Sequence, residues 1–67
     1  MKRVALYVTV NCANGTDYDQ EPNYYQSLDG LFEGLKVAVQ TANLECSMET
    51  GDIPSSILLL VVPLEDM

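Results

Sequence analysis

Residues 3–12 alternate between apolar side chains and side chains of mixed character, with a period of two. Within the strand, the opposite face carries Ala5, Tyr7 and Thr9, none of which is charged. Alternation of this kind, with many β-branched residues, predicts a half-buried β-strand. The apolar positions on its buried face are Val4, Leu6, Val8, Val10 and Cys12.

The pattern then changes to a helical one. Residues 13–23 are a polar stretch of turn formers, which predicts a long loop. Residues 24–43 place apolar side chains on one face at about 100° per residue, which predicts an amphipathic helix with Asn23 as its N-cap. Gly30 and Gly34 lie together beside this face. They indicate either close packing of the helix on a sheet or a groove that admits a second helix. The apolar face comprises Tyr24, Leu28, Leu31, Phe32, Leu35, Ala38, Val39 and Ala42.

Two further strands are predicted after the helix. Residues 44–49 alternate apolar with polar side chains, which is typical of an amphipathic strand. Residues 50–54 have turn chemistry. Residues 56–64 are apolar on both faces up to Pro63, which favours a central strand.

These elements predict one α+β domain over residues 1–67 with the order βαββ. Because the most apolar strand is expected at the centre, the predicted three-stranded sheet has the order 1-3-2, with the helix on one face. The other face would then expose an apolar patch, and such patches usually mark association surfaces. We therefore expect a homodimer or higher homo-oligomer through this open face or a sheet edge. The predicted interface residues are Ala5, Tyr7, Leu58, Leu60 and Val62.

Charge narrows the choice of partners. The 67 residues contain three Lys and Arg against ten Asp and Glu, no histidine, and a formal net charge of −7. This balance argues against direct binding to nucleic acid or to anionic membranes. The predicted strand directions place Lys2 and Arg3 near Glu65 and Asp66, a neutral end. They gather five of the other acids at the opposite end, where we expect partner-binding residues at Asp17, Tyr18, Asp19, Glu21, Glu49 and Asp52. The alternative is that this acidic end only keeps the protein soluble.

Catalytic and cofactor chemistry finds little support in the sequence. No nucleophile has a recognisable base, and no glycine-rich phosphate loop is present. The run from Asp17 to Glu21 imitates the opening of a calcium loop, but Pro22 and Leu28 occupy the positions that require Gly and Glu. We expect no enzyme, no metal and no cofactor. We interpret Cys12 and Cys46 as reduced, buried residues of a cytoplasmic protein without a signal peptide or membrane span.

In size, acidity and lack of catalytic motifs the chain resembles the small proteins with which bacterial viruses block host defence enzymes, such as anti-CRISPR proteins and DNA mimics. This resemblance is one of composition and includes no specific motif. It implies a non-catalytic inhibitor that occupies a basic, nucleic-acid-handling surface of a partner protein. The alternative is an oligomeric βαββ protein that binds a small molecule or nucleotide between subunits. A third hypothesis is a purely structural assembly subunit.

Overall fold

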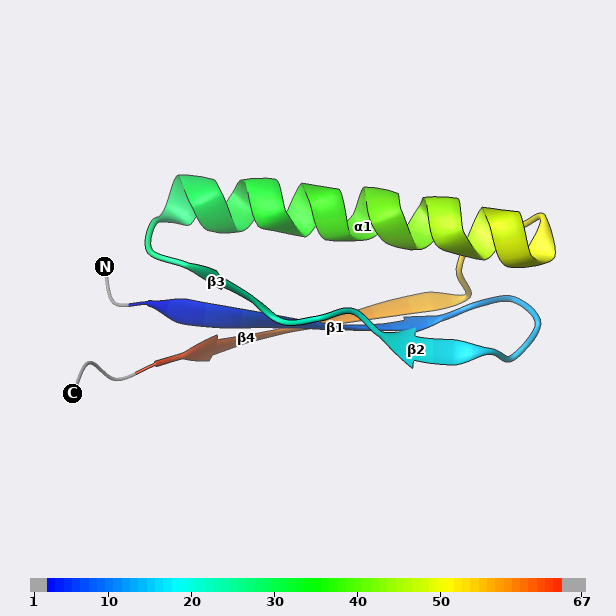
Figure 1. Cartoon of the computed structure of the whole chain (residues 1–67), viewed down its shortest axis with the longest axis horizontal. Coiled ribbons are helices and arrows are strands. Elements are labelled where there is room, and N and C mark those ends of the chain that lie inside the picture. The colour runs from blue at the N-terminus through cyan, green and yellow to red at the C-terminus, as the bar shows by residue number, and fades with distance from the viewer. Residues whose placement is uncertain (1–2, 65–67) are drawn as a thin grey trace.

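The computed structural model describes residues 3–64, and it contains one long helix packed on one side of an antiparallel sheet (Figure 1). The α+β class and the single helix layer predicted from the sequence are confirmed. The elements are β1 (Val4–Asn11), β2 (Asp17–Asp19), β3 (Asn23–Tyr25), α1 (Leu28–Thr50) and β4 (Ser56–Pro63).

The strand β1 is the centre of the sheet. It pairs antiparallel with β4 along its whole length on one side, from Val4 opposite Pro63 to Asn11 opposite Ser56. Its other side pairs with β2 near one end and with β3 near the other, and both pairings are antiparallel. The predicted order 1-3-2 is matched only in part. The antiparallel pairing of the first predicted strand with the strand at 56–64 is confirmed, but the apolar segment 56–63 is an edge strand and the alternating segment 4–11 is central.

The predicted strand over residues 44–49 is also wrong, since these residues form the last turns of α1. Alternation is ambiguous over so short a stretch, and the buried positions instead continue the helical spacing. Cys46 is fully buried, whereas Leu44 and Met48 are 63% and 79% exposed. The helix therefore buries a narrow stripe through its whole length, comprising Leu31, Ala38, Ala42 and Cys46.

Both ends of α1 have clear chemical signals. Ser27 is the N-cap in place of the predicted Asn23, and its Oγ accepts a hydrogen bond from the backbone N–H of Gly30 at 3.0 Å. Gly51 closes the other end with φ of 76°, a left-handed conformation that glycine adopts without a Cβ clash. Its N–H donates to the carbonyl oxygen of Ser47 at 2.8 Å.

The expected loop at residues 13–23 contains β2 and the start of β3. A tight turn returns the chain along β1, with the Asn14 side chain accepting a hydrogen bond from the N–H of Thr16 at 3.0 Å. The N–H of Cys12 donates to the carbonyl of Thr16 at 2.7 Å. These short strands satisfy backbone groups along one side of β1, which a polar loop would leave to water.

The hydrophobic core lies between β1 and α1. Leu6, Val8 and Val10 are at most 4% exposed and face the buried stripe of the helix. By contrast, β4 contributes no fully buried residue, and only Ile57 packs partly against the core. The helix side of β1 therefore supplies most of the core residues that come from the sheet.

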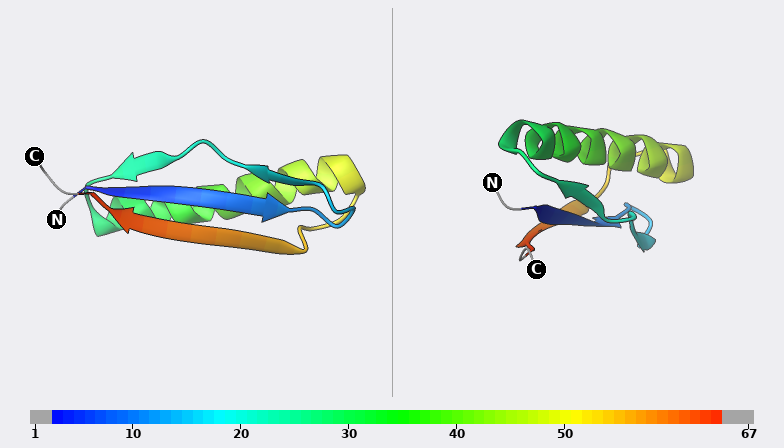
Figure 2. Two further views of the ribbon diagram at one scale, coloured as in Figure 1. Left: turned by 90° about the horizontal axis from the view of Figure 1, so that it is seen from below. Right: turned by 60° about the vertical axis from the view of Figure 1, so that its left-hand side comes forward.

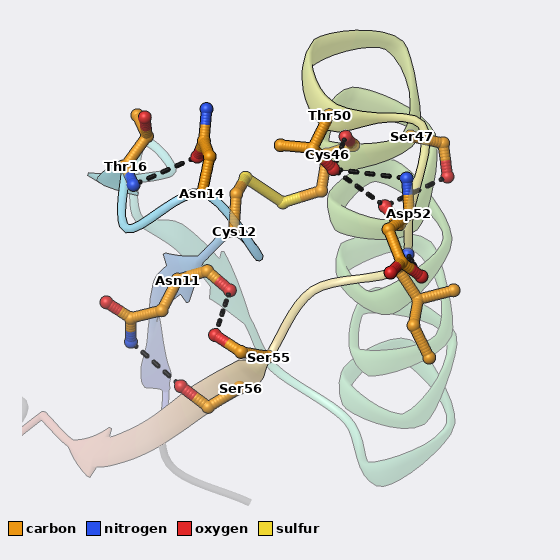
Figure 3. Close-up of a disulfide and its surroundings, with 11 residues drawn as sticks. Asn11, Cys12, Asn14, Thr16, Cys46, Ser47, Thr50, Asp52, Ser55 and Ser56 are labelled. Atoms are coloured by element: carbon orange, nitrogen blue, oxygen red, sulfur yellow. Dashed lines mark hydrogen bonds between the residues drawn. A yellow bond between two sulfur atoms is a disulfide. The ribbon is translucent and has the colours of Figure 1, made fainter.

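A disulfide bond joins Cys12, just after β1, to Cys46 in α1, with 5.3 Å between their Cα atoms (Figure 3). The interpretation of these residues as reduced cysteines is therefore wrong. The sequence pattern did not predict this pairing, because it placed Cys46 in a strand at 44–49 and not in the helix that lies over β1. The bond closes a separation of 34 residues, for which loop-closure entropy gives about 3–4 kcal/mol of stabilisation.

Of the two interpretations of Gly30 and Gly34, the structure favours close packing over a groove for a second helix. A Cβ atom at Gly34 would overlap the phenol ring of Tyr25 from β3. At Gly30 a Cβ would meet Ser27 Oγ at 3.1 Å. Glycine at position 34 therefore allows the chain leaving β3 to lie directly beside the helix.

The predicted neutral end lies largely outside the described residues. Lys2, Glu65 and Asp66 fall outside residues 3–64, and only Arg3 of this group is described.

Candidate functional site

The sheet face opposite α1 has no cover from the described part of the chain (Figure 2). Side chains alternate between the faces of a strand, and directly paired residues share a face. Since Leu6, Val8 and Val10 face the helix, the intervening residues of β1 face away from it. We call this surface the open face. With their register partners on β2, β3 and β4, its members are Ala5, Tyr7, Thr9, Asn11, Asp17, Asp19, Tyr24, Ser56, Leu58, Leu60 and Val62.

The five residues expected at an oligomer interface do share the open face. Leu58 and Leu60 are 61% and 59% exposed, and Tyr7, which pairs with Leu60, is 41% exposed. Ala5 is fully buried between its register partners Tyr24 and Val62. The accessible apolar area is therefore concentrated on β4 and on the tyrosine beside it.

The acidic residues expected at one end are divided between two sides of the molecule. Asp17 and Asp19 lie on the open face, opposite Asn11 and Thr9. The hydroxyl of Thr9 donates to Oδ1 of Asp19 at 2.8 Å, which fixes the carboxylate beside β1. Their neighbour Tyr18 lies on the helix side, opposite the buried Val10.

Tyr18 marks an acidic hollow between β2 and the last turns of α1. Its walls include Glu45 and Glu49, and the volume is about 190 Å³. The hydroxyl oxygen of Tyr18 is enclosed and has no hydrogen-bond partner among residues 3–64. Burial, followed by the negative charge of Glu45, raises the pKa of this phenol above its ordinary value of 10.0. Glu21 lines an adjoining hollow that shares Tyr18 and Glu45.

Asp52 has a local role at the end of the helix (Figure 3). Its Oδ1 accepts a hydrogen bond from the N–H of Ile53 at 2.8 Å, and its carbonyl oxygen accepts one from Thr50 Oγ1 at 3.3 Å. Of the expected acidic set, Asp52 and Glu49 thus belong to the C-terminal end of α1, while Asp17 and Asp19 belong to the sheet.

Positive charge is scarce in the structure. Residues 3–64 hold eight carboxylate side chains and two cationic ones, and the ion pair found among them joins Lys36 Nζ to Glu33 Oε1 at 3.4 Å. This pair is exposed, so it contributes little to stability. The other carboxylates of the described segment are left without a cationic partner there. No group of three or more metal-ligating side chains is placed to hold an ion within this range.

Sequence reasoning missed Tyr24 as an open-face residue. The helical wheel assigned it to the helix core, but it stands on β3 opposite Ala5 and is 56% exposed. The signal that could have separated it from the helix is Ser27, a strong N-cap residue that lies after it.

The edge of the sheet formed by β4 is the second distinctive surface. β4 pairs with β1 on one side, and no strand of the described chain pairs with it on the other. Leu59 and Val61, on the helix side of the strand, are 43% and 38% exposed. Residues 53–64 contain no charged side chain, so this edge is both apolar and neutral.

No protein-family model matches the chain, and neither curated proteins nor solved structures gave a match. None of the described helices has the length and apolar character needed to cross a membrane.

Proposed function

We propose that the chain is a small non-catalytic binding protein whose open face docks onto a basic protein, as an inhibitor of a nucleic-acid-handling partner would. The observation that carries this proposal is the make-up of the open face. Exposed Tyr7 lies on the central strand β1, beside the exposed leucines of β4. Across β1 from β4, Asp17 and Asp19 of β2 lie toward one end of the face and exposed Tyr24 of β3 lies toward the other.

This surface combines the groups that recognise a basic protein. Carboxylates form charge-assisted hydrogen bonds with Arg and Lys, and tyrosine supplies a large contact area at low entropic cost. The face comes from paired strands, so its residues are held in place before binding. The overall negative charge would steer a basic partner and raise the association rate at low salt.

The structure changes which acids should matter. The original set of five carboxylates does not form one surface, and Asp17 with Asp19 is the pair that shares a face with exposed tyrosines. Tyr18 points to the helix side and is replaced in this role by Tyr7 and Tyr24. The phosphate-mimicking role is accordingly assigned to the carboxylates of β2.

A defined probe tests the assignment. A fluorescently labelled arginine-rich peptide should bind the protein, with an affinity that falls as salt rises. Asp17→Lys with Asp19→Lys should weaken binding at least about tenfold. Asp29→Lys with Glu33→Lys changes the net charge equally from α1 and should have a much smaller effect. Equal losses from both double variants would show that only net charge matters and would overturn the proposal.

The disulfide bears on where the protein works. Disulfides persist in oxidising compartments and are rare in the cytosol. We therefore favour an oxidising environment over the cytoplasm for the working form of the protein, with Cys12 and Cys46 joined. Alkylation of the protein isolated from its native source, without reductant, should label neither cysteine. Labelling of both would restore the cytoplasmic interpretation.

A further inference from the structure

We infer that two copies of this chain join edge to edge through β4, antiparallel about a twofold axis, to make one continuous sheet with both helices on the same face. This goes beyond the proposed binding role, which uses the open face and not the edge. The starting observation is an eight-residue edge strand that is unpaired on one side, uncharged, and apolar on both faces.

The direction of the hydrogen-bonding groups along this edge follows from one backbone hydrogen bond at the end of β4. The N–H of Leu64 donates to the carbonyl of Arg3 at 2.9 Å, so these residues form a hydrogen-bonded pair. Such pairs alternate along an antiparallel ladder. The backbone groups of Leu58, Leu60 and Val62 consequently point toward β1. Those of the intervening residues Ile57, Leu59, Val61 and Pro63 point away from the sheet.

A second copy satisfies this edge in one register better than in others. A twofold axis normal to the sheet preserves the side that each residue faces, so odd-numbered residues must lie opposite odd-numbered residues. If Leu59 lies opposite Leu59 of the second copy, Ile57 lies opposite Val61. Every outward N–H of these residues then finds a carbonyl. A shift that places Ile57 opposite Pro63 loses a donor, because proline has no N–H.

The two flanks of α1 also differ in a way that favours a second copy on the β4 side. Its flank toward β2 and β3 carries Gly30 and Gly34, which admit Tyr25. Its other flank carries bulky apolar residues, of which Leu28 and Phe32 are 58% and 54% exposed. In the paired sheet the two β1 strands are three strand spacings apart, about 14 Å. Helices of about 10–12 Å diameter above them leave a narrow gap. Large side chains of this flank would fill it, together with Leu59 and Val61 below.

The charge distribution is compatible with a second copy at this edge. A net charge of −7 on each chain opposes association wherever acids face each other. Residues 53–64 form an uncharged stretch that includes the whole of the β4 edge, so two copies can approach there without placing carboxylates in contact. Covering a neutral apolar edge also removes a template for uncontrolled strand addition. A twofold interface is self-complementary by construction.

Sedimentation equilibrium of the intact, oxidised chain tests the inference. The unaltered protein should be a dimer at micromolar concentration. Leu59→Pro removes an outward N–H but none of the bonds to β1, and it should raise the dimer dissociation constant about 100-fold or more. Leu44→Ser removes an exposed leucine from α1 and should leave the dimer unchanged. Circular dichroism should show that both variants keep their helix.

Two further variants keep the result decisive. If Leu59→Pro does not fold, Leu59→Lys places a charge on the same edge and should also give a monomer. Tyr7→Glu alters the open face without touching the edge, and the dimer should persist. A monomeric unaltered protein would overturn the inference, as would a dimer that dissociates with Tyr7→Glu but survives Leu59→Pro. The latter outcome would indicate association through the open face and leave the basic-partner proposal to its own peptide test.

Discussion

Two eight-residue strands, β1 and β4, have similar apolar character but opposite surroundings. On the helix side of β1, Leu6 and Val8 are 2% and 4% exposed, whereas their register partners on β4, Val61 and Leu59, are 38% and 43% exposed. The two strands pair residue by residue over their whole length. Their difference is therefore one of position: β1 has strands on both sides and a helix above it, and β4 has one neighbour. Apolarity on both faces of a strand therefore does not by itself make the strand central, and on β4 it leaves apolar side chains that residues 3–64 do not cover.

The largest expected contrast is between a substitution on the helix side of β1 and one on the open face of β4. Leu6→Asp places an unpaired carboxylate in the core and should cost about 5 kcal/mol or more, enough to unfold a small domain. Leu60→Asp changes an exposed side chain and should alter the unfolding free energy by about 1 kcal/mol or less. Urea denaturation followed by circular dichroism measures both, preferably at concentrations below the dimer dissociation constant. Similar losses for the two variants would contradict the burial of Leu6 under the helix and the exposure of Leu60 on the open face.

Removal of the disulfide should have the next largest effect on the free energy of unfolding. The bond attaches the chain just after β1 to the helix, whereas β4 has no such covalent link. The double variant Cys12→Ser with Cys46→Ser should lose about 3–4 kcal/mol of unfolding free energy. Reduction of the unaltered protein should give a comparable loss. Comparing the two experiments separates the effect of the serine hydroxyls from the effect of the missing bond. A loss below about 1 kcal/mol in both experiments would mean that the bond contributes little to the fold.

A smaller change in stability is expected on the flank of α1 that Tyr25 covers. Gly34→Ala should destabilise the protein by about 1–3 kcal/mol, because the methyl group meets the ring of Tyr25. Gly30→Ala is the matched control: its nearest neighbour is the movable Ser27 hydroxyl, so the gain in helix propensity of about 1 kcal/mol can offset the contact. Thermal unfolding of both proteins compares them. Equal stability of the two would show that Tyr25 is not held against Gly34.

The comparison also shows where sequence reasoning succeeds and fails. Alternation in residues 4–12 identified a strand and its buried face, and helical spacing located most of α1. The register partners of β1 then placed the expected interface residues on one face. Strand order failed because hydrophobicity was equated with a central position, which holds only when the chain can cover both faces by itself.

The disulfide and the ends of the helix were missed for a local reason. Leu44, Cys46 and Met48 alternate as a strand would, and a run of three such positions does not separate a period of 2 from one of 3.6. Only tertiary packing, which buries Cys46 beside Cys12, selects the helix. The division of the acidic residues between two sides followed from β2, whose three residues send Tyr18 to one face and its neighbours to the other.

Amide hydrogen exchange along β4 tests the central claim most directly, because neighbouring residues of one strand report on its two sides. Leu58, Leu60 and Val62 should be protected at all concentrations by their bonds to β1. Ile57, Leu59 and Val61 should be protected at high protein concentration and lose protection on dilution, as the second copy leaves the edge. Rapid exchange of these three amides at concentrations of several hundred micromolar would contradict the account.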